Sequence, residues 1–254
     1  MLNPSDALDA FEIGGIQGIL FDIDETLVDL KTASIAGFKQ MVHADFAGLG
    51  GQEIDLIARD FANDRVGAYD RYMAGELTFL GQRVLRLTYA YEQAGLKPPR
   101  HEEFEAWADA YELKVRAGWK PFPDVLPFLN QLDELAIPYG AVSNNVEEYQ
   151  RGKLVAAGIP GFEVVVGSDT AGAPKPDKAP FISGCLALGT EPAKTLYIGD
   201  NPLTDYQGAV DAGLQSLLLD RGSTHRNFAG HRIENFNQFA SFYVENPGFF
   251  AELA

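Results

Sequence analysis

The chain has 254 residues, of which 46% are hydrophobic and 11% aromatic, so it can bury a substantial core, and global disorder is excluded. Its formal net charge of −16 argues against binding to nucleic acid or to an anionic membrane surface, because both carry negative charge. The single cysteine, Cys185, rules out an intrachain disulfide, and the sequence has neither a run of about 18 apolar residues nor a secretory signal, so we expect a cytoplasmic protein.

Short apolar runs that are typical of strands alternate with helical patterns along most of the chain. The predicted strands are 16–23, 138–144, 162–168, 195–200 and 214–220. The predicted helices between 124 and 212 are 124–135, 146–157, 177–188 and 204–212. Apolar strands joined by helices of this length indicate an α/β fold, with a Rossmann-like parallel sheet and helices on both faces.

Residues 30–118 interrupt this alternation with helical patterns and no convincing strand. The patterns cover 32–46, 53–62, 76–94 and 102–117. We therefore expect residues 1–29 and 119–254 to form the sheet-bearing core, and residues 30–118 to form an inserted helical domain. After Arg221 the pattern is ambiguous, with an edge strand near 232–236 and a terminal helix as the expectation.

Polar side chains gather where three predicted strands end. Asp22 and Asp24 end the first strand, Ser143 and Asn144 the second, and Asp200 the fourth. Residues two apart on a strand point to the same side, and two carboxylates held so close need a cation or a shared proton. Because ligands of open parallel sheets bind beyond the carboxyl ends of the strands, we expect a functional site there.

These residues carry a resemblance to a known family. The motifs, in chain order, are Asp22-x-Asp24-x-Thr26, Ser143, Lys175 and Gly199-Asp200-Asn201 followed by Asp205. In their order and their places on the predicted sheet they resemble the haloacid dehalogenase superfamily, of the phosphatase type with a helical cap inserted after the first strand. The resemblance covers nearly the whole chain and is weakest in the cap and the tail.

The resemblance implies catalytic and phosphate-binding roles. Asp22 would attack phosphorus to form an aspartyl-phosphate, and Asp24 would act as general acid and then as general base. Lys175 would place a positive charge against Asp22 and the transferring group. The residues expected to bind phosphate are Thr26, Ser143, Asn144 through its backbone N–H, and Lys175.

The resemblance also implies a metal site. Asp22 and Asp200 would bind a divalent cation together with the backbone carbonyl of Asp24, and Mg²⁺ is the expected ion because it prefers oxygen ligands and phosphate. Asp205 is expected to support these ligands rather than to contact the ion.

The presence of Asp24 favours Mg²⁺-dependent hydrolysis of a phosphomonoester among the reactions of this superfamily, because relatives that displace halide lack an acid at this position. The expected substrate is a small phosphorylated metabolite, such as a nucleoside monophosphate or a small sugar or acid phosphate. Glu25 stands where glycine is frequent, as in a subset that includes nucleotide phosphatases. Two alternatives are a sugar-phosphate mutase of the same superfamily and a catalytically silent small-molecule binding protein. The oligomeric state is not predicted.

Substrate specificity in capped relatives comes largely from the insertion. The candidates are Arg71, Tyr72, Arg83 and Arg86. Arg83 and Arg86 lie three apart, on one helical face. The alternative for these residues is a solvated or salt-bridged helix surface.

Overall fold

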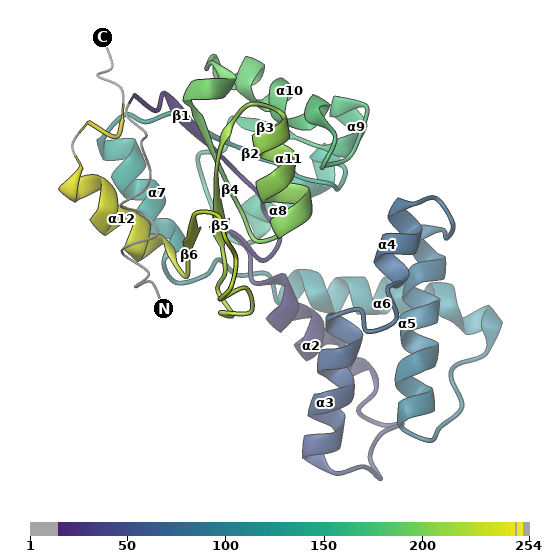
Figure 1. Ribbon diagram of the computed structural model, residues 1–254. Coiled ribbons are helices and arrows are strands. Elements are labelled where there is room, and N and C mark those ends of the chain that lie inside the picture. Colours follow the sequence, from purple (N-terminus) through teal and green to yellow (C-terminus); the bar gives the residue numbers. More distant parts are fainter. Residues whose placement is uncertain (1–14, 247, 251–254) are drawn as a thin grey trace. The chain divides into compact units, whose positions relative to one another are not determined.

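The computed structural model describes residues 15–246 and 248–250 and divides the chain into two compact units (Figure 1). The described residues up to Asp29 and from Pro121 onward form the first unit, and Leu30–Lys120 form the second. Residues 1–14, 247 and 251–254, which the expected core includes, lie outside the described residues.

The second boundary follows Lys120, whereas the sequence predicts it after residue 118. The reason is pairing between the two connecting segments of the first unit. Val28 forms an isolated antiparallel bridge with Pro121, and the Phe122 N–H donates to the Leu27 carbonyl at 3.1 Å. The chain therefore rejoins the first unit where this pairing begins.

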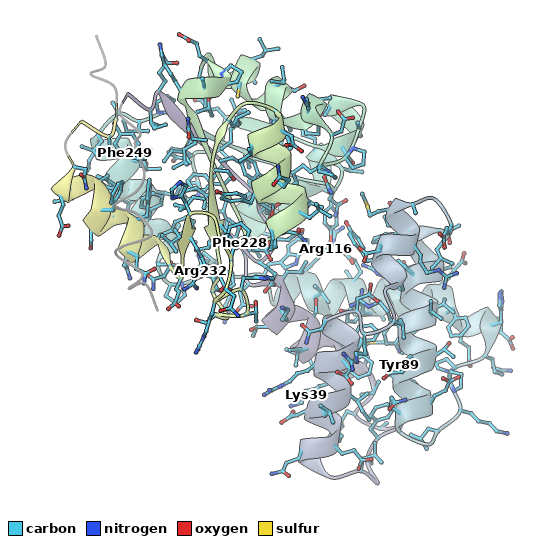
Figure 2. All side chains as sticks on the ribbon, viewed as in Figure 1. Lys39, Tyr89, Arg116, Phe228, Arg232 and Phe249 are labelled. Atoms are coloured by element: carbon cyan, nitrogen blue, oxygen red, sulfur yellow. The ribbon has the colours of Figure 1, made fainter. Side chains whose placement is uncertain are left out.

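All six strands of the sheet are parallel, in the order β3-β2-β1-β4-β5-β6. The strands are β1 (Gly18–Phe21), β2 (Tyr139–Val142), β3 (Val164–Val166), β4 (Thr195–Gly199), β5 (Gln215–Leu219) and β6 (Arg232–Ile233). Each predicted strand is present but shorter, and the predicted edge strand is β6. Arg232, labelled in Figure 2, lies on this strand and pairs with Asp220 at 3.0 Å. The predicted fold class is confirmed.

The helices of this unit are α7 (Val125–Glu134), α8 (Glu147–Ala156), α9 (Ser168–Ala171), α10 (Lys178–Leu188), α11 (Gly208–Asp211) and α12 (Phe236–Glu245), with the 3₁₀ turn η2 (Pro192–Lys194) and the π-helix η3 (Pro202–Gln207). The predicted helix over 204–212 is wrong in type, because it divides into η3 and the short α11. Asn201 starts η3 early by accepting hydrogen bonds from the N–H groups of Leu203 and Thr204. π-Helical turns are frequent at functional sites.

The sheet is buried on both faces, as a parallel sheet requires. Leu20 on β1 packs in a cluster with Phe181 of α10, on one face. Its neighbour Phe21 points to the other face, where it contacts Phe128 of α7 and Phe236 of α12 at ring distances of 6.1 and 5.7 Å. Figure 1 shows α7 beside α12, and α10 beside α11. This alternation explains why the strands read as continuous apolar runs.

Gly184 allows α10 to approach the sheet closely. A Cβ atom there would lie 2.7 Å from Leu20 Cδ1 and 2.9 Å from Val142 Cγ2. We expect Gly184→Ala to lower the free energy of unfolding by about 1–3 kcal/mol, because this interior cannot yield without strain. Gly152→Ala on α8 is the matched control, since a Cβ there meets nothing within 4 Å. It should raise stability by about 0.5–1 kcal/mol.

Urea denaturation of both variants checks the prediction. Effects of the same sign would show that the close approach at Gly184 does not limit packing.

The second unit contains helices and no strand, and the structure describes all of its residues. The helices are α2 (Leu30–Met41), α3 (Gly51–Ala62), α4 (Ala68–Met73), α5 (Phe79–Gln93) and α6 (Phe104–Ala117), with the 3₁₀ turn η1 (His101–Glu103). Its core includes Phe38 stacked on Phe61 at 4.4 Å. The short α4 is not predicted from the sequence; Asp64 starts it by accepting from the N–H groups of Ala68 and Tyr69. Within the described residues, no helix has the length and apolar character needed to cross a bilayer.

Candidate active site

Three neighbouring strands bring the predicted residues to one edge of the sheet. Asp22 follows β1, Ser143 follows β2 and Asp200 follows β4. Parallel pairing of β2, β1 and β4 places their carboxyl ends side by side. The Asp22 N–H still donates to the Ile198 carbonyl of β4 at 2.9 Å, so the first carboxylate starts from a fixed backbone. The predicted convergence of these strand ends at one edge of the sheet is therefore present in the structure.

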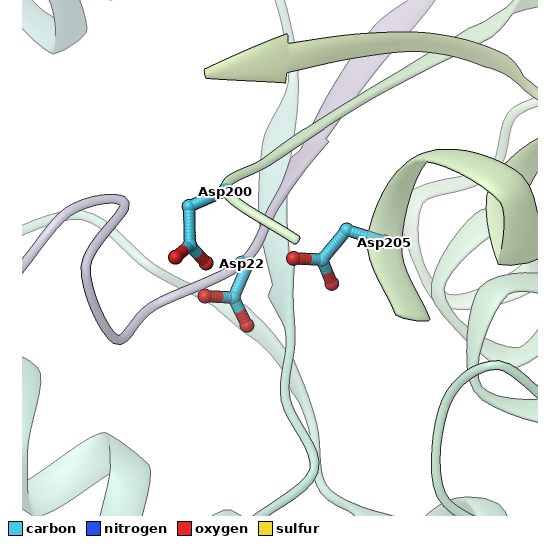
Figure 3. A group of neighbouring side chains, drawn as sticks. All are labelled: Asp22, Asp200 and Asp205. Atoms are coloured by element: carbon cyan, nitrogen blue, oxygen red, sulfur yellow. The ribbon is translucent and has the colours of Figure 1, made fainter. Parts of the chain in front are cut away.

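Three carboxylates converge at this edge. One oxygen from each of Asp22, Asp200 and Asp205 lies within 4.8 Å of the others. Figure 3 shows Asp22 and Asp200 projecting from strand ends while Asp205 reaches them from η3. Asp22 and Asp205 are buried, with 7% and 2% of their surfaces exposed. Such a cluster of oxygen ligands suits a small divalent cation.

Lys175 is the buried cation beside this cluster. Its Nζ lies 2.6 Å from Asp22 Oδ1 and 2.7 Å from Asp205 Oδ1. It also donates to the Tyr197 hydroxyl at 2.8 Å and to the Val142 carbonyl at 3.0 Å. The ammonium is thus enclosed by oxygen acceptors, which fixes its position.

The Asn144 side chain holds the backbone of Lys175. Asn144 Oδ1 accepts from the Lys175 N–H at 2.6 Å, and Asn144 Nδ2 donates to the Lys175 carbonyl at 2.9 Å. The sequence predicts only a backbone role for Asn144 toward phosphate, so this side-chain contact is an addition. It ties the strand end of β2 to the loop that carries the lysine.

The single positive charge of Lys175 does not neutralise the three carboxylates of the cluster. Burial raises the pKa of Asp22 to about 7, with Lys175 opposing the shift and Asp205 adding to it. Burial and the Asp22 carboxylate likewise raise the pKa of Asp200 to about 8. For Lys175, burial acts to lower the pKa, but Asp205 and Asp22 outweigh it and hold that pKa well above its usual value. The cluster therefore favours a proton or a further cation, and its three oxygen donors fit Mg²⁺.

This charge surplus predicts how Mg²⁺ changes stability. The ordinary pKa of 3.8 is that of an unfolded carboxyl, so Asp22 and Asp200 bind more protons in the folded protein. The free energy of unfolding of the metal-free protein should therefore fall as the pH rises from about 4 to about 8. Mg²⁺ takes the place of the protons, so its stabilisation should be larger at about pH 8 than at about pH 5.

Melting temperatures measured with Mg²⁺ and with a chelator, at both pH values, check this prediction. At a Mg²⁺ concentration that is 100 times the dissociation constant at about pH 8, and is the same at both pH values, the ion should add about 2.7 kcal/mol at about pH 8. Asp200→Asn is the control and should lose most of the Mg²⁺ effect. Equal Mg²⁺ shifts at the two pH values would contradict the prediction.

Both oxygens of Asp205 are engaged by the chain. Oδ1 accepts from Lys175 Nζ, and Oδ2 accepts from the Asn201 N–H at 3.0 Å. These bonds favour the supporting role that the sequence predicts for Asp205. Its place among the three converging oxygens also makes it an available ligand, so the supporting role stays a prediction.

The side chain of Asp24 lies apart from the three-carboxylate cluster and contacts α8. Lys153 Nζ lies 2.5 Å from Asp24 Oδ1, and Gln150 Nε2 donates to Asp24 Oδ2 at 3.1 Å. Gln150 Nε2 also donates to Ser143 Oγ at 2.6 Å. Gln150, Lys153 and Tyr197 were missed in the sequence analysis. For Gln150 and Lys153 the available signal was that two polar side chains lie one turn apart on a predicted helix.

The loop after Asp24 is tightly fixed. Glu25 has a φ of +62°, in the left-handed region that favours glycine, which is the residue that the resemblance leads us to expect at this position. Thr26 is fully buried, and its carbonyl accepts from Arg221 Nη2 at 2.9 Å. No described residue provides a hydrogen-bond partner for Thr26 Oγ1. The phosphate-binding role of Thr26 stays a prediction.

The four candidate specificity residues of the second unit form two groups, of which the first is Arg83 and Arg86 on α5. Arg83 pairs with Glu112 and lies over the Phe79 ring at 4.5 Å. Arg86 donates to the Phe61 carbonyl from Nη2 at 2.6 Å and lies over the Phe61 ring at 4.6 Å. The ion pair of Arg83 fits the salt-bridged alternative, whereas Arg86 is held by the backbone and the ring of Phe61.

Arg71 and Tyr72 lie on α4, outside those contacts. Arg71 is exposed and pairs with Glu76 at 3.1 Å, and the Tyr72 ring contacts Phe79 at 5.6 Å. Substrate contact by any of the four residues stays a prediction.

Residues 16–213 match the haloacid dehalogenase-like hydrolase family. The chain belongs to this family. Glyceraldehyde 3-phosphate phosphatase of Methanopyrus kandleri is 29% identical over 234 residues, covering 91% of this chain and 94% of that one. Phosphoglycolate phosphatase of Aquifex aeolicus is 28% identical over 202 residues, covering 79% and 83%. The predicted family is confirmed, and so is the enzyme class, a phosphoric monoester hydrolase.

The fold has solved counterparts in the same family. The magnesium-bound putative HAD-hydrolase YfnB of Bacillus subtilis aligns with a TM-score of 0.72 and 17% identity, covering 91% of this chain and 99% of that one. This likeness concerns the fold; the arrangement of Asp22, Lys175 and Asp200 rests on the distances given above.

Proposed function

We propose that this haloacid dehalogenase-like hydrolase is a Mg²⁺-dependent, cytoplasmic phosphatase that hydrolyses a small phosphomonoester through an aspartyl-phosphate on Asp22. The observation that carries the proposal is the different environment of two neighbouring carboxylates. Asp22 is buried against Lys175 and beside Asp200, whereas Asp24 is held by α8. One carboxylate is thus set for attack and the other for proton transfer.

In the first step an Asp22 oxygen forms a bond to phosphorus while the bond from phosphorus to the alcohol oxygen breaks. The Asp24 proton goes to that oxygen, so the alcohol leaves uncharged. In the second step a water oxygen attacks phosphorus, its proton goes to Asp24, and the bond to Asp22 breaks. Inorganic phosphate leaves and both carboxyl groups return to their starting states.

Other residues of the edge hold the phosphoryl group. Lys175 places a fixed positive charge beside the Asp22 oxygen. The Ser143 hydroxyl and the Asn144 backbone N–H would bind the non-bridging oxygens, and donors fixed in advance stabilise charge that grows in the transition state. Asp22, Asp200 and the Asp24 carbonyl would hold Mg²⁺, which would offset the repulsion between the Asp22 carboxylate and phosphate.

The names of two relatives support the proposed substrate class. The two phosphatases named above act on glyceraldehyde 3-phosphate and phosphoglycolate, according to their names. We therefore place small sugar and acid phosphates first, and nucleoside monophosphates second.

The decisive experiment measures phosphate release from a panel of these esters by the purified protein with Mg²⁺. Release from at least one ester, abolished by a chelator, supports the proposal. Isomerisation of a sugar phosphate without phosphate release would instead favour the mutase. Binding without turnover of any ester would favour the silent scaffold.

A further inference from the structure

Two polar side chains of α8 are buried beneath the proposed site. Gln150 and Lys153 are 0% and 1% exposed, and they lie three residues apart on one helical face. A buried ammonium is costly unless a partner compensates it, so the contact that Lys153 makes is not incidental. That partner is Asp24, whose side chain keeps 28% of its surface exposed.

The two residues hold the Asp24 carboxylate at both oxygens. Lys153 Nζ contacts Oδ1 at 2.5 Å, and Gln150 Nε2 contacts Oδ2 at 3.1 Å. A carboxylate fixed at one oxygen can still rotate, but bonds to both oxygens set its plane as well as its position. Since both donors come from one helix, they move together.

Gln150 also sets the direction of the Ser143 hydroxyl. Ser143 Oγ accepts from Gln150 Nε2 at 2.6 Å and from the Asn145 N–H at 3.3 Å. A serine hydroxyl has two acceptor lone pairs and one hydrogen. With both lone pairs occupied, the hydrogen is left to donate to another acceptor, such as a phosphate oxygen.

The orientation of the Gln150 amide follows from its neighbours. When Asp24 is ionised, a reversed amide would place an acceptor oxygen against its carboxylate, so in this state the nitrogen faces Asp24. Among the described residues Gln150 Oε1 then has no hydrogen-bond partner, although it is buried. A buried oxygen left in this state does not serve stability, which points to function.

We propose that Gln150 and Lys153 are positioning residues. Both align the Asp24 carboxyl group for proton transfer, and Gln150 also directs the hydroxyl hydrogen of Ser143 toward phosphate. This inference rests on the proposed function. It assigns α8 a part in the reaction in which both residues act through Asp24 or Ser143 and not on phosphorus itself.

Lys153→Met tests the Asp24 arm, because it removes the ammonium and keeps most of the side-chain volume. With enzyme in excess, the consumption rate of an alkyl phosphate should fall at least about tenfold, while that of nitrophenyl phosphate should fall less than about threefold. The nitrophenolate leaves without a proton, so the first step with this ester does not need an aligned acid. Lys153→Arg should recover most of the alkyl phosphate rate.

Gln150→Leu tests the Ser143 arm. It should raise KM for every ester and weaken inhibition by inorganic phosphate about tenfold, because the Ser143 hydrogen is no longer directed. Glu148→Gln is the matched control, since it alters an exposed group on the same helix and should leave both readouts unchanged. Melting temperatures establish that each variant is folded.

Several outcomes overturn the inference. Equal rate losses for the two esters in Lys153→Met would assign Lys153 a purely structural role, and rates equal to those of Glu148→Gln would show that Lys153 has no part in the reaction. Unchanged phosphate inhibition in Gln150→Leu would remove the Ser143 arm. If the wild-type protein released no phosphate from any ester, the proposed function would fail, and the inference would fail with it. If the wild-type protein is active but Lys153→Met or Gln150→Leu gives one of the contrary results above, the inference alone is refuted.

Discussion

Asp22→Asn is expected to abolish phosphate release, with kcat falling by at least about 10⁴-fold. Asparagine has nearly the same shape as aspartate, but its amide does not attack phosphorus to form the acyl phosphate. Lys175 keeps its contact with Asp205 at 2.7 Å in this variant, so the ammonium is not left without a partner and the fold should persist. The measurement is steady-state phosphate release with the best ester of the panel.

The matched control for Asp22→Asn is Asp109→Asn, which makes the same chemical change at an exposed position on α6. Its kcat should equal that of the wild type. Circular dichroism should show both variants folded. Substantial activity in folded Asp22→Asn would remove Asp22 as the nucleophile.

Asp24→Asn is expected to reduce kcat for alkyl phosphates by about 10²- to 10⁴-fold, because the alkoxide then leaves without a proton. The loss should be smaller for nitrophenyl phosphate, whose leaving group is stable as an anion. The ratio of the two losses is therefore the informative quantity. It is measured from kcat for a series of esters with leaving groups of increasing acidity.

Asparagine at position 24 has one acceptor oxygen, so it can accept from Lys153 or from Gln150 but not from both, and its amide nitrogen then faces the other donor. The melting temperature of the variant establishes that it is folded. Equal losses in kcat across the ester series would indicate that hydrolysis of the intermediate limits turnover. Equal losses in the rate of ester consumption, measured with enzyme in excess, would contradict the general-acid role of Asp24.

Local sequence patterns predicted the sheet and the residues at its edge. Apolar runs identified the strands, and parallel strands with covered faces bring their carboxyl ends together, so Asp22, Ser143 and Asp200 were found without knowledge of contacts. The prediction of a single helix over 204–212 was wrong in helix type, because the Asn201 cap and Pro202 start a π-helix. The periodicity of the sequence does not reveal which helix type a cap selects.

Partners distant in sequence leave no such pattern. Gln150 and Asp24 are 126 residues apart, and Lys153 and Asp24 are 129 apart. Nothing in the local sequence around α8 says which buried polar residue faces the site, because that depends on how β2 and β1 pair. The same holds for Tyr197, which looks like an ordinary strand residue until its hydroxyl is seen at 2.8 Å from Lys175 Nζ.

The Asp22 and Asp24 side chains are chemically identical, and only one residue separates them, yet each is bound to a different lysine. Lys175 reaches Asp22 from the loop before α10, and Lys153 reaches Asp24 from α8. A substitution at Lys153 leaves the contacts of Lys175 with Asp22 and Asp205 in place. Attack on the ester and proton delivery are therefore open to separate adjustment, so that mutation can retune one half of the reaction while the other half is kept.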